Sequence, residues 1–438
     1  MMVRELIRIV KGELLCGTNV LFNDIITDTR KDCLDNLFIA LKGKSDDGNL
    51  YIKQAISKGC KVIMTEDDKV YDVAVVRVKN CYESLFLLGD FYRTKYDIPL
   101  IGITGSVGKT MTKDLIGNIL SKKYCVLKSA GNYNNHIGVP KTLFKLHDKH
   151  QLIVCEMGMN HFHEIARLSK VCRPWVGVIT NIGTAHIGNL GSKKNILQAK
   201  MEITSGLSNG PLVVNGDDNL LKRVDYFNLI KCGVKRGNDF KAFNIVSDIY
   251  RTTFDVLING KRVSFVFNMG GEYLLMDVLL AIQVGLLFNV AIEDIKNSVA
   301  NFKVALRRMA VVSLSNHNVL IDDCYNASYE AIMGGLSLVK KSSLSKVIIL
   351  GNILELGKYS ERIHKKIVKN FKKTPNSLLL LVGNNFKNIQ NKNVKRFENN
   401  QQLILYLKKL DFSKTLFYIK GSRAMHLEEI VTFIKQKV

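Results

Sequence analysis

The stretch GITGSVGKTMTKDL, residues 102–115, constrains the fold more strongly than any other part of the chain. The apolar run PLIGIT leads into it and a helix-compatible segment follows, an order typical of loops that cradle a triphosphate. Gly105 and Gly108 permit a close backbone approach to phosphate oxygens. Lys109 can reach the β- and γ-phosphates, and the Thr110 hydroxyl can ligate Mg²⁺. In the usual phosphate-loop motif a glycine stands five positions before the one that precedes the lysine. Here that position is Ile103, and the glycine stands one position earlier, at Gly102. The stretch therefore predicts a bound triphosphate, but leaves open whether the γ-phosphate goes to water, drives motion or reaches a second substrate.

Apolar runs separated by helix-like segments predict three α/β domains in series. The first hundred residues alternate short runs, such as CKVIMTE and VAVVRV, with helix-like YIKQAISKG, and YRTKYDIP (92–99) reads as a linker. From 100 to about 300, PLIGIT, QLIVCEMG, WVGVITN and PLVVNGDD suit strands buried on both faces of a parallel sheet. Beyond ANFKVALRRM (300–309), NVLIDDC, KVIILGN, LLLLVGN and TLFYIKG predict a second doubly wound domain. We expect domains at 1–97, 98–305 and 306–438.

Composition limits the class of protein. The 438 residues include 63 Lys and Arg against 39 Asp and Glu, a net charge of +24. Because the basic residues are scattered along the chain, they favour attraction of anionic substrates over nucleic-acid binding. The nine cysteines include no CxxC pair, which indicates reduced thiols in a cytoplasm. Polar residues interrupt the apolar stretch 274–292, so we expect a buried core helix and no membrane insertion. We also expect a monomeric protein.

Polar residues that follow the predicted strands are candidates for the rest of a site, because α/β sheets place their chemistry at strand ends. Glu156 ends one buried run and suits a Mg²⁺ ligand, although a solvated loop glutamate fits equally well. Asn181 and His186 follow the next run. A lone histidine is more often structural than a metal ligand, and Mg²⁺ prefers oxygen to nitrogen.

Two further positions carry chemistry with more than one reading. Lys200 lies on a predicted helix and suits a solvated or phosphate-pairing lysine. A buried lysine of lowered pKa could instead capture CO₂ and become a carbamate, which is an oxygen ligand. Asp322 and Asp323 end a strand of the last domain, where an acidic pair suits a ribose, a metal-bound water or a substrate ammonium. Capping of the following helix is the structural alternative.

With these residues assembled, the chain resembles the Mur ligase family, the ATP-dependent amide-forming enzymes of peptidoglycan synthesis. Beyond the phosphate loop, the likeness runs in order through segments spread over nearly the whole chain: TDTRK (27–31), LFIALKGKSDDG (37–48), GNYNNHIGVPKTLF (131–144), EMGMNHFHEIA (156–166), TNIGTAHI, AKMEI, VNGDD, IDDCYNAS, LGNILELG (350–357) and YIKGSRAMHLEE (418–429). The resemblance implies a small N-terminal UDP-sugar-binding domain, a central ATPase-like parallel-sheet domain and a C-terminal Rossmann-like domain.

The last segments, and LFIALKGKSDDG, resemble the members that add D-Ala-D-Ala to UDP-N-acetylmuramoyl-tripeptide. No DNPR-like or DDPR-like segment of the kind usual in the third-residue-adding members occurs. The implied reaction phosphorylates the terminal carboxylate of the tripeptide with ATP. The amine of D-Ala-D-Ala then attacks the acyl phosphate, and phosphate leaves. The third residue of the acceptor peptide stays open.

The resemblance also implies roles for individual residues. Lys109 would act on the γ-phosphate, with Thr110 and Glu156 on one Mg²⁺, and with His186 and a carbamylated Lys200 at a second cation. Implied nucleotide contacts are Gly105, Ser106, Val107, Gly108, Lys109, Thr110, Met111, Asn181, Arg308, Asp322 and Asp323. Implied UDP-sugar contacts are Thr29, Arg30, Lys42, Gly43, Asp47 and Gly48. Asn134 and Asn135 resemble substrate contacts of the central domain, and the dipeptide side of the cleft would comprise Asn326, Ala327, Leu356, Ser422 and Arg423.

Several positions depart from the family pattern: Val107, Met111, Tyr273, Leu274, Asp277, Tyr329 and Asn352. The first two bear on nucleotide affinity, and Tyr273 and Asp277 on the adenine side of the site. Two alternatives stay open. One is another ligase of the family, of the third-residue-adding or folate-glutamating type. The other is a phosphate-loop regulatory protein that uses its positive charge on nucleic acid, for which steeply salt-dependent binding would be the sign.

Overall fold

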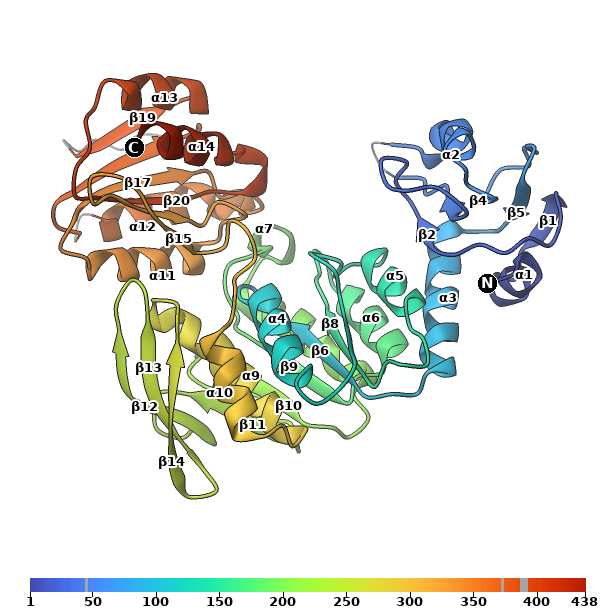
Figure 1. Cartoon of the computed structure of the whole chain (residues 1–438), viewed down its shortest axis with the longest axis horizontal. Helices are drawn as coiled ribbons and strands as arrows, with labels where there is room; N and C mark the ends of the chain where they lie inside the picture. The colour runs from blue at the N-terminus through green and yellow to red at the C-terminus, as the bar shows by residue number, and fades with distance from the viewer. Residues whose placement is uncertain (44–45, 372–373, 387–392) are drawn as a thin grey trace.

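The computed structural model describes residues 1–43, 46–371, 374–386 and 393–438. Its strands form three sheets that follow one another along the chain, one in each of the lobes seen in Figure 1. The N-terminal lobe stands to one side of the central lobe, and the C-terminal lobe packs on the other side. The predicted architecture of successive α/β units is confirmed, while the boundaries at 97/98 and 305/306 stay predictions.

The first sheet has the order β1-β5-β4-β3-β2 and is parallel except for the antiparallel pair β1·β5. Its strands are short, and three of them coincide with the apolar runs of the first hundred residues. The elements are α1 Val3–Val10, β1 Glu13–Cys16, β2 Ile25–Ile26, β3 Leu37–Ile39, α2 Ile52–Ser57, β4 Val62–Thr65, β5 Ala74–Arg77 and α3 Cys81–Lys95.

The predicted linker at 92–99 is wrong over its first half, because helix α3 continues to Lys95. Tertiary contacts hold this last turn. The Arg93 guanidinium is buried and donates to the carbonyls of Cys172 at 2.7 Å and Tyr96 at 2.8 Å. The Tyr92 ring lies 4.8 Å from that of Phe144. Buried contacts of this kind outweigh local signals at a helix end, so only residues 96–99 separate α3 from the next strand.

The central sheet has nine strands in the order β14-β13-β12-β11-β10-β9-β6-β8-β7. The four predicted runs form β6, β8, β9 and β10, and they pair in parallel as expected. Its strands are β6 Leu100–Thr104, β7 Val126–Lys128, β8 Leu152–Glu156, β9 Val176–Ile179, β10 Leu212–Asn215, β11 Leu229–Gly233, β12 Phe240–Ser247, β13 Thr252–Ile258 and β14 Lys261–Phe267. The helices are α4 Lys109–Leu120, α5 Gly138–Phe144, α6 Glu164–Cys172, α7 Ile187–Leu190, α8 Lys193–Met201, α9 Leu275–Leu287 and α10 Ile292–Ala300.

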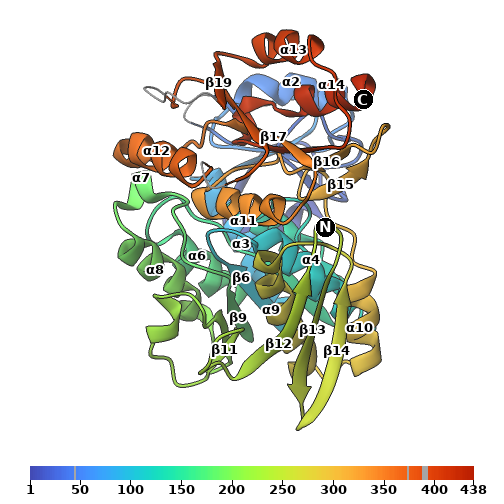
Figure 2. The same ribbon diagram turned by 90° about the vertical axis from the view of Figure 1, so that its left-hand side faces the viewer.

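An antiparallel ribbon extends this parallel sheet. Strands β12, β13 and β14 pair antiparallel with one another and project away from the sheet in Figures 1 and 2. Along β12, FKAFNIVS, inward and outward side chains alternate, which leaves one face of that strand to water. The continuously apolar runs used for the prediction do not contain this period, so the ribbon was not foreseen.

The apolar stretch 274–292 forms the buried helix α9, as predicted. It packs against α4, the helix that follows the phosphate loop, and against β10 and β11. None of the helices in the described ranges combines the length and apolar character needed to cross a bilayer.

The C-terminal sheet has the order β15-β16-β20-β17-β18-β19 and is parallel except for its antiparallel edge strand β15. This confirms the second parallel α/β unit. Its elements are β15 Ala310–Ser313, β16 Val319–Asp322, α11 Tyr329–Lys340, β17 Ser345–Gly351, α12 Ser360–Phe371, β18 Ser377–Val382, β19 Val394–Phe397, α13 Asn400–Lys408, β20 Thr415–Lys420 and α14 Glu428–Lys437. In the view of Figure 2, α11 faces the central lobe, while α13 and α14 lie on the far side.

The core of the first lobe includes a residue from the central one. Phe144 at the end of α5 is buried in the cluster formed by residues of α1, α3 and the first sheet, among them Val3, Leu37 and Leu85. Its ring also stacks on that of Phe22, with centroids 6.2 Å apart. The two lobes therefore share apolar packing along α3 and α5.

Candidate active site

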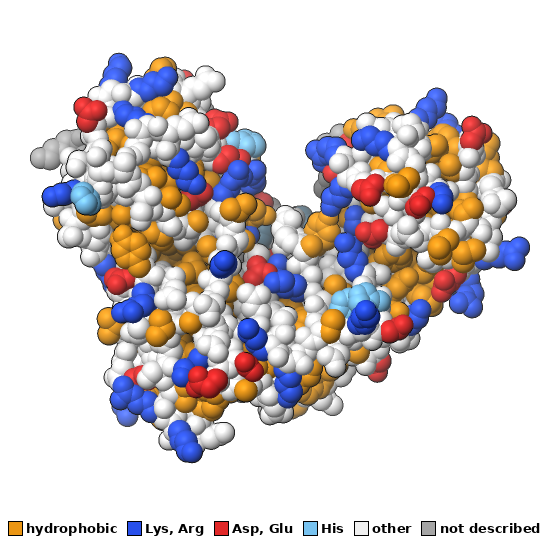
Figure 3. Space-filling view, in the orientation of Figure 1, with side chains coloured by type: hydrophobic (Ala, Val, Ile, Leu, Met, Phe, Trp, Pro, Cys, Tyr) orange, Lys and Arg blue, Asp and Glu red, His pale blue; other side chains and the backbone are white. Residues whose placement is uncertain are grey.

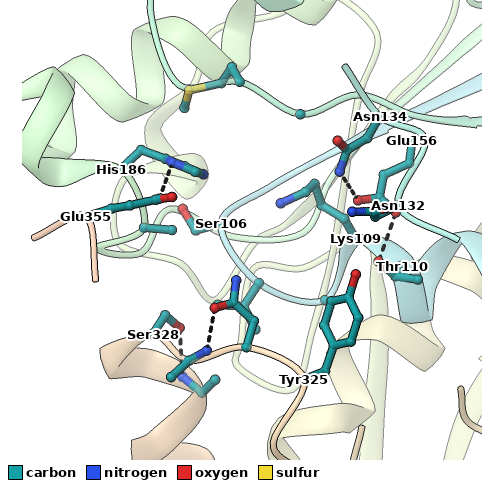
Figure 4. A pocket seen from close by; sticks show the side chains of 18 of the residues that line it. Ser106, Lys109, Thr110, Asn132, Asn134, Glu156, His186, Tyr325, Ser328 and Glu355 are labelled. Atoms are coloured by element: carbon teal, nitrogen blue, oxygen red, sulfur yellow. Dashed lines mark hydrogen bonds and ion pairs between the residues drawn. The ribbon is translucent and has the colours of Figure 1, made fainter. Parts of the chain in front are cut away.

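A pocket of about 1080 Å³ opens where the carboxyl ends of β6, β8 and β9 face the C-terminal lobe. It is lined by the phosphate loop, by the segments after β8 and β9, and by loops of the C-terminal sheet. Figure 4 shows side chains from the two lobes pointing into it. Loops after adjacent parallel strands meet at one edge of a sheet, which is why distant polar residues converge here.

The phosphate loop has the backbone that its glycines predict. Gly105 has φ +147°, and a Cβ there would lie 1.9 Å from the Thr180 hydroxyl oxygen. Gly108 has φ +88°, and a Cβ there would lie 2.2 Å from an Asp277 carboxylate oxygen. Neither position has room for a side chain, so both glycines are structurally required. Helix α4 starts directly after the loop, and its N-terminus faces the pocket.

Lys109 is half-buried, and its Nζ donates to the Gly105 carbonyl at 2.8 Å. Burial is the main factor that lowers its pKa, and Arg308 contributes. Val107 and Met111, the two departures within the loop, both line the pocket. The loop thus presents a lysine and backbone N–H groups to an anion, which fits the predicted triphosphate.

Asn181 braces this loop. Its Oδ1 accepts from Val107 N at 3.0 Å and its Nδ2 donates to Val107 O at 3.1 Å. The Ser106 hydroxyl accepts from Gly183 N at 2.9 Å. The segment after β9 therefore fixes the shape of the loop through several hydrogen bonds. Both the oxygen and the nitrogen of the Asn181 side-chain amide are bonded to the protein backbone.

Thr110 and Glu156 form the oxygen donor set predicted for Mg²⁺. Thr110 Oγ1 donates to Glu156 Oε2 at 2.9 Å, and Asn134 Nδ2 donates to Glu156 Oε1 at 2.7 Å. The Glu156 side chain is buried. A hydroxyl and a carboxylate beside a phosphate loop fit the preference of Mg²⁺ for oxygen ligands, with phosphate oxygens and water completing the shell.

His186 and Lys200, the residues expected at a second cation, differ in placement. His186 lines the pocket, and its Nδ1 lies 2.8 Å from Glu355 Oε2 of the C-terminal lobe. Lys200 is buried on α8 and does not line the pocket. Its burial, together with the charge of Lys109, sets its pKa well below the usual value. No group of three or more His, Cys, Asp or Glu side chains in the described part of the chain is arranged to hold a metal ion.

The two acidic residues Asp322 and Asp323 of the last lobe differ in their placement relative to the pocket. Asp323 lines the pocket and accepts from Lys420 Nζ at 2.6 Å, and burial raises its pKa. Asp322 is buried beside it, 3.4 Å from the Cys324 amide, and does not line the pocket. Arg308 lies in the pocket with its guanidinium 4.1 Å from the centre of the Tyr325 ring.

The residues expected on the dipeptide side all line the pocket: Asn326, Ala327, Leu356, Ser422 and Arg423. The expected central-domain substrate contacts, Asn134 and Asn135, line it as well. Asn135 Oδ1 accepts from the backbone N–H of Gly138, the first residue of α5, at 2.9 Å. Ser422 Oγ accepts from Leu354 N at 2.9 Å, and Arg423 donates to Glu428 at 2.8 Å.

The residues expected to bind the UDP-sugar gather on the first lobe, away from this pocket. Thr29 is buried and donates to Gln54 at 2.6 Å, whereas Arg30 is exposed and paired with Asp28 at 2.8 Å. Lys42 and Asp47 form an isolated bridge, and Gly48 N donates to Leu41 O at 2.8 Å. Gly43 N donates to Asp46 O, also at 2.8 Å. Figure 3 shows a wide hollow between this lobe and the C-terminal one.

Sequence reasoning missed two acidic residues of the interface. Glu330 on α11 accepts from the amide and hydroxyl of Thr184 at 2.9 and 2.8 Å, and from Lys193 at 3.0 Å. Glu355 meets His186. Glu355 lies inside the quoted segment LGNILELG, but a carboxylate whose partner is 169 positions away in sequence leaves no local signal.

This fold and pocket define a three-domain protein whose phosphate loop lies in a pocket shared between two of its lobes. Residues 103–285 match the Mur ligase middle domain. The chain is 31% identical to the UDP-N-acetylmuramoyl-tripeptide–D-alanyl-D-alanine ligase of Bacillus subtilis, over 98% of this chain and 97% of that protein. The chain belongs to the Mur ligase family.

Other relatives agree in name and coverage. The enzyme of the same name from Escherichia coli is 29% identical over 99% of this chain and 98% of its own. The crystal structure of MurF from Acinetobacter baumannii superposes with a TM-score of 0.91 at 27% identity, covering 99% of this chain and 98% of that one. The likeness to the MurF ligase of Thermotoga maritima, at 23% identity and a TM-score of 0.85 over 95% and 97% of the two chains, is one of fold.

Proposed function

We propose that the chain is an ATP-dependent ligase that joins D-alanyl-D-alanine to UDP-N-acetylmuramoyl-tripeptide in peptidoglycan precursor synthesis, releasing ADP and phosphate. The observation that carries the proposal is the convergence of a triphosphate loop and the C-terminal lobe on one pocket. The relatives that bear this name align over almost the whole chain. They favour this substrate pair over those of the third-residue-adding and folate-glutamating ligases.

The chemistry follows from the nature of a carboxylate, which is a poor electrophile until one oxygen becomes a leaving group. Transfer of the γ-phosphoryl group of ATP to the terminal carboxylate of the tripeptide makes an acyl phosphate. The amine of D-Ala-D-Ala attacks its carbonyl carbon and forms a tetrahedral intermediate. The C–N bond forms, the C–O bond to phosphorus breaks, phosphate leaves with the electron pair and the amine gives up its proton. Lys109 lies where it can stabilise charge moving onto the γ-phosphate, and Arg308 adds positive charge to the same pocket.

Mg²⁺, when bound, supplies positive charge that stabilises the transferring phosphoryl group. Thr110 and Glu156 would hold it. Asn134 fixes the second oxygen of the Glu156 carboxylate, so that its orientation does not depend on the ion. Asn134 thereby positions a ligand in addition to any contact with the acceptor substrate.

We extend the proposal to a second cation site at His186 and a carbamylated Lys200. Support comes from the burial of Lys200 and the low pKa of its amine, because the neutral amine is the form that combines with CO₂ to give a carbamate and a proton. A ¹³C-NMR carbamate resonance from protein equilibrated with ¹³CO₂, absent in Lys200→Met, would support it. The same spectrum for both proteins would rule it out.

We assign recognition of the UDP-sugar to six residues of the first lobe: Thr29, Arg30, Lys42, Gly43, Asp47 and Gly48. Because that lobe lies across the hollow of Figure 3 from the ATP pocket, catalysis then requires the lobes to close. A structure with an ATP analogue and UDP-tripeptide should bring them together. Reacting groups left more than ~10 Å apart would contradict closure, since near-attack geometry needs ~3–3.5 Å.

We further propose that the enzyme works in the cytoplasm as a monomer without nucleic acid. The cysteines are all unbridged, and eight of the nine are at least partly shielded from solvent, consistent with a reducing compartment. Sedimentation at several protein concentrations tests the monomer, and retention on DNA or RNA at low salt would count against the last point.

The decisive experiment is phosphate release with each substrate omitted in turn. We expect release only when ATP, UDP-N-acetylmuramoyl-tripeptide and D-Ala-D-Ala are all present. We expect no phosphate release when meso-diaminopimelate replaces D-Ala-D-Ala and the UDP-dipeptide is the acceptor. We also expect no phosphate release with glutamate and a folate. Release with either alternative pair, and not with D-Ala-D-Ala, would move the chain to another branch of the family.

A further inference from the structure

Glu355 occupies an unusual position in the pocket. Its backbone has φ +64°, a left-handed conformation that glutamate rarely adopts. Its carbonyl accepts from Gly188 N at 3.1 Å, which ties this turn to the segment just after His186. The side chain then reaches His186, whose Nδ1 lies 2.8 Å from Oε2 (Figure 4). A strained residue held by contacts on both sides of a domain interface points to a role in the site.

The other acidic side chains of the described pocket wall have established partners. Glu156 accepts from Thr110 and Asn134, and Glu330 from Thr184 and Lys193. Asp323 is paired with Lys420, Asp277 with the Thr112 hydroxyl, and Glu164 caps the backbone of 160–161. The Glu355 side chain, in contrast, is 57% exposed. Its Oε1 receives no hydrogen bond from residues in the described ranges.

Glu355 shares the pocket with the phosphate loop. Its side chain lines the same cavity as Ser106 and Lys109. Figure 4 shows Glu355 beside His186 and near Ser106. The acyl phosphate of the proposed reaction would form in this cavity.

We propose that Glu355 binds the α-ammonium group of D-Ala-D-Ala and holds the nitrogen beside the acyl phosphate. This inference rests on the function proposed above and names the residue that recognises the incoming amine. The substrate arrives as an ammonium ion, because an α-amino group has a pKa near 8. A carboxylate in this cavity attracts that cation and orients it through a charge-assisted hydrogen bond. The bound ammonium gives up one proton to solvent water, and the lone pair of the resulting neutral amine then attacks the acyl carbon. His186 fixes the carboxylate from the opposite lobe, so amine binding requires the two lobes to be docked.

Hydroxylamine separates this role from a structural one. It is largely uncharged near neutral pH and needs no ammonium site, yet its nitrogen attacks an acyl phosphate in the same way. The C–N bond forms, the C–O bond to phosphorus breaks, phosphate leaves with the electron pair and the nitrogen loses a proton. The product is a hydroxamate, measured as its iron complex. Hydroxamate formation with ATP and UDP-tripeptide thus reports acyl phosphate formation without D-Ala-D-Ala.

The test compares Glu355→Gln with wild type in both reactions. We expect the variant to lose on the order of 10- to 100-fold in kcat/KM for D-Ala-D-Ala, the effect of one hydrogen bond between charged groups, with the KM for ATP and the hydroxamate rate unchanged. The matched control is Glu361→Gln, an exposed glutamate paired with Lys365 on α12, which should alter neither reaction.

An equal fall of both reactions would overturn the inference, since Glu355 would then serve acyl phosphate formation or a cation shared with His186. An unchanged kcat/KM for D-Ala-D-Ala would overturn it as well. If wild-type protein forms no hydroxamate with ATP and UDP-tripeptide, the proposed ligase activity itself fails. That result can be told apart from a failure of the Glu355 inference, because it is measured on wild-type protein alone.

Discussion

The Asp277 carboxylate lies directly against Gly108 of the phosphate loop, so close that a methyl group on Gly108 would approach one of its oxygens to 2.2 Å. The same carboxylate accepts from the Thr112 hydroxyl at 3.1 Å. Helix α9 thus places an ionisable group under the loop that is proposed to carry the nucleotide. Burial raises the pKa of Asp277 to about 7. Asp277 is one of the positions that depart from the family pattern.

Replacing Asp277 by asparagine should stabilise the fold, and more so at higher pH. The unfolded carboxyl ionises near pH 3.8 and the folded one near pH 7, so stability falls as pH rises across that window. Above pH 7 the full penalty, about 4 kcal/mol, is present, and Asp277→Asn removes it. Urea unfolding near pH 4 and near pH 8 measures the difference. Exposed Asp148→Asn is the control, and an equal gain at both pH values would contradict the prediction.

Loss of the loop lysine should stop phosphoryl transfer. Lys109→Met removes the positive charge closest to the proposed γ-phosphate, and we expect ADP formation to fall by about 10²–10³-fold. The initial rate with all three substrates measures this. Lys122→Met, an exposed lysine just beyond the far end of α4, is the matched control and should keep the wild-type rate. A Lys109 variant as fast as this control would remove the loop from the chemistry.

The magnesium ligand pair predicts an altered metal requirement. Thr110→Ala deletes the hydroxyl that lies 2.9 Å from Glu156, and should raise the Mg²⁺ concentration for half-maximal rate about tenfold. The rate at saturating Mg²⁺ should recover in part. Thr432→Ala, on the exposed face of α14, gives the reference curve. Superimposable Mg²⁺ curves for the two variants would argue against Thr110 as a ligand.

Glu330 predicts how firmly the C-terminal lobe is docked. Glu330→Gln cancels the ion pair with Lys193 and weakens the bonds from Thr184, leaving the interface easier to open. We expect a larger radius of gyration in small-angle X-ray scattering and a rate lowered roughly tenfold. Glu293→Gln, which breaks an exposed pair on α10, should change neither quantity. Unchanged scattering and rate in the Glu330 variant would show that docking does not depend on this contact.

Much of the fold follows from local pattern. The runs that became β6, β8, β9 and β10 are apolar throughout, and such strands require helices on both faces. The glycines at 105 and 108 predict a backbone with positive φ and no room for a side chain. The structure has positive φ at both positions, with Thr180 close to Gly105 and Asp277 close to Gly108. Thr110 and Glu156, predicted to share one Mg²⁺, lie within hydrogen-bond distance of each other, and Asn134, predicted as a substrate contact, also reaches Glu156.

The features that were missed depend on contacts between distant parts of the chain. The end of α3 is set by Arg93 reaching carbonyls near Cys172, and no helix signal near residue 92 records that. In strand β12 of the ribbon, inward and outward side chains alternate with period two. The strands that were predicted are continuous apolar runs, which lack this alternation. The position of Glu355 depends on a left-handed backbone and on the docking of another lobe. A glutamate within LGNILELG predicts neither of these features.

The burial of Phe144 inside the first lobe bears on how the chain is made. Synthesis runs from the N-terminus, and domains generally fold as they emerge from the ribosome. Here the side chain that packs among Val3, Leu37 and Leu85 is translated well after the last strand and helix of that lobe. Until it arrives, Phe22 lacks the ring that stacks on it, and Tyr92 lacks one of the rings around it. The first lobe of the nascent chain therefore completes its core only after the phosphate loop has already been synthesised.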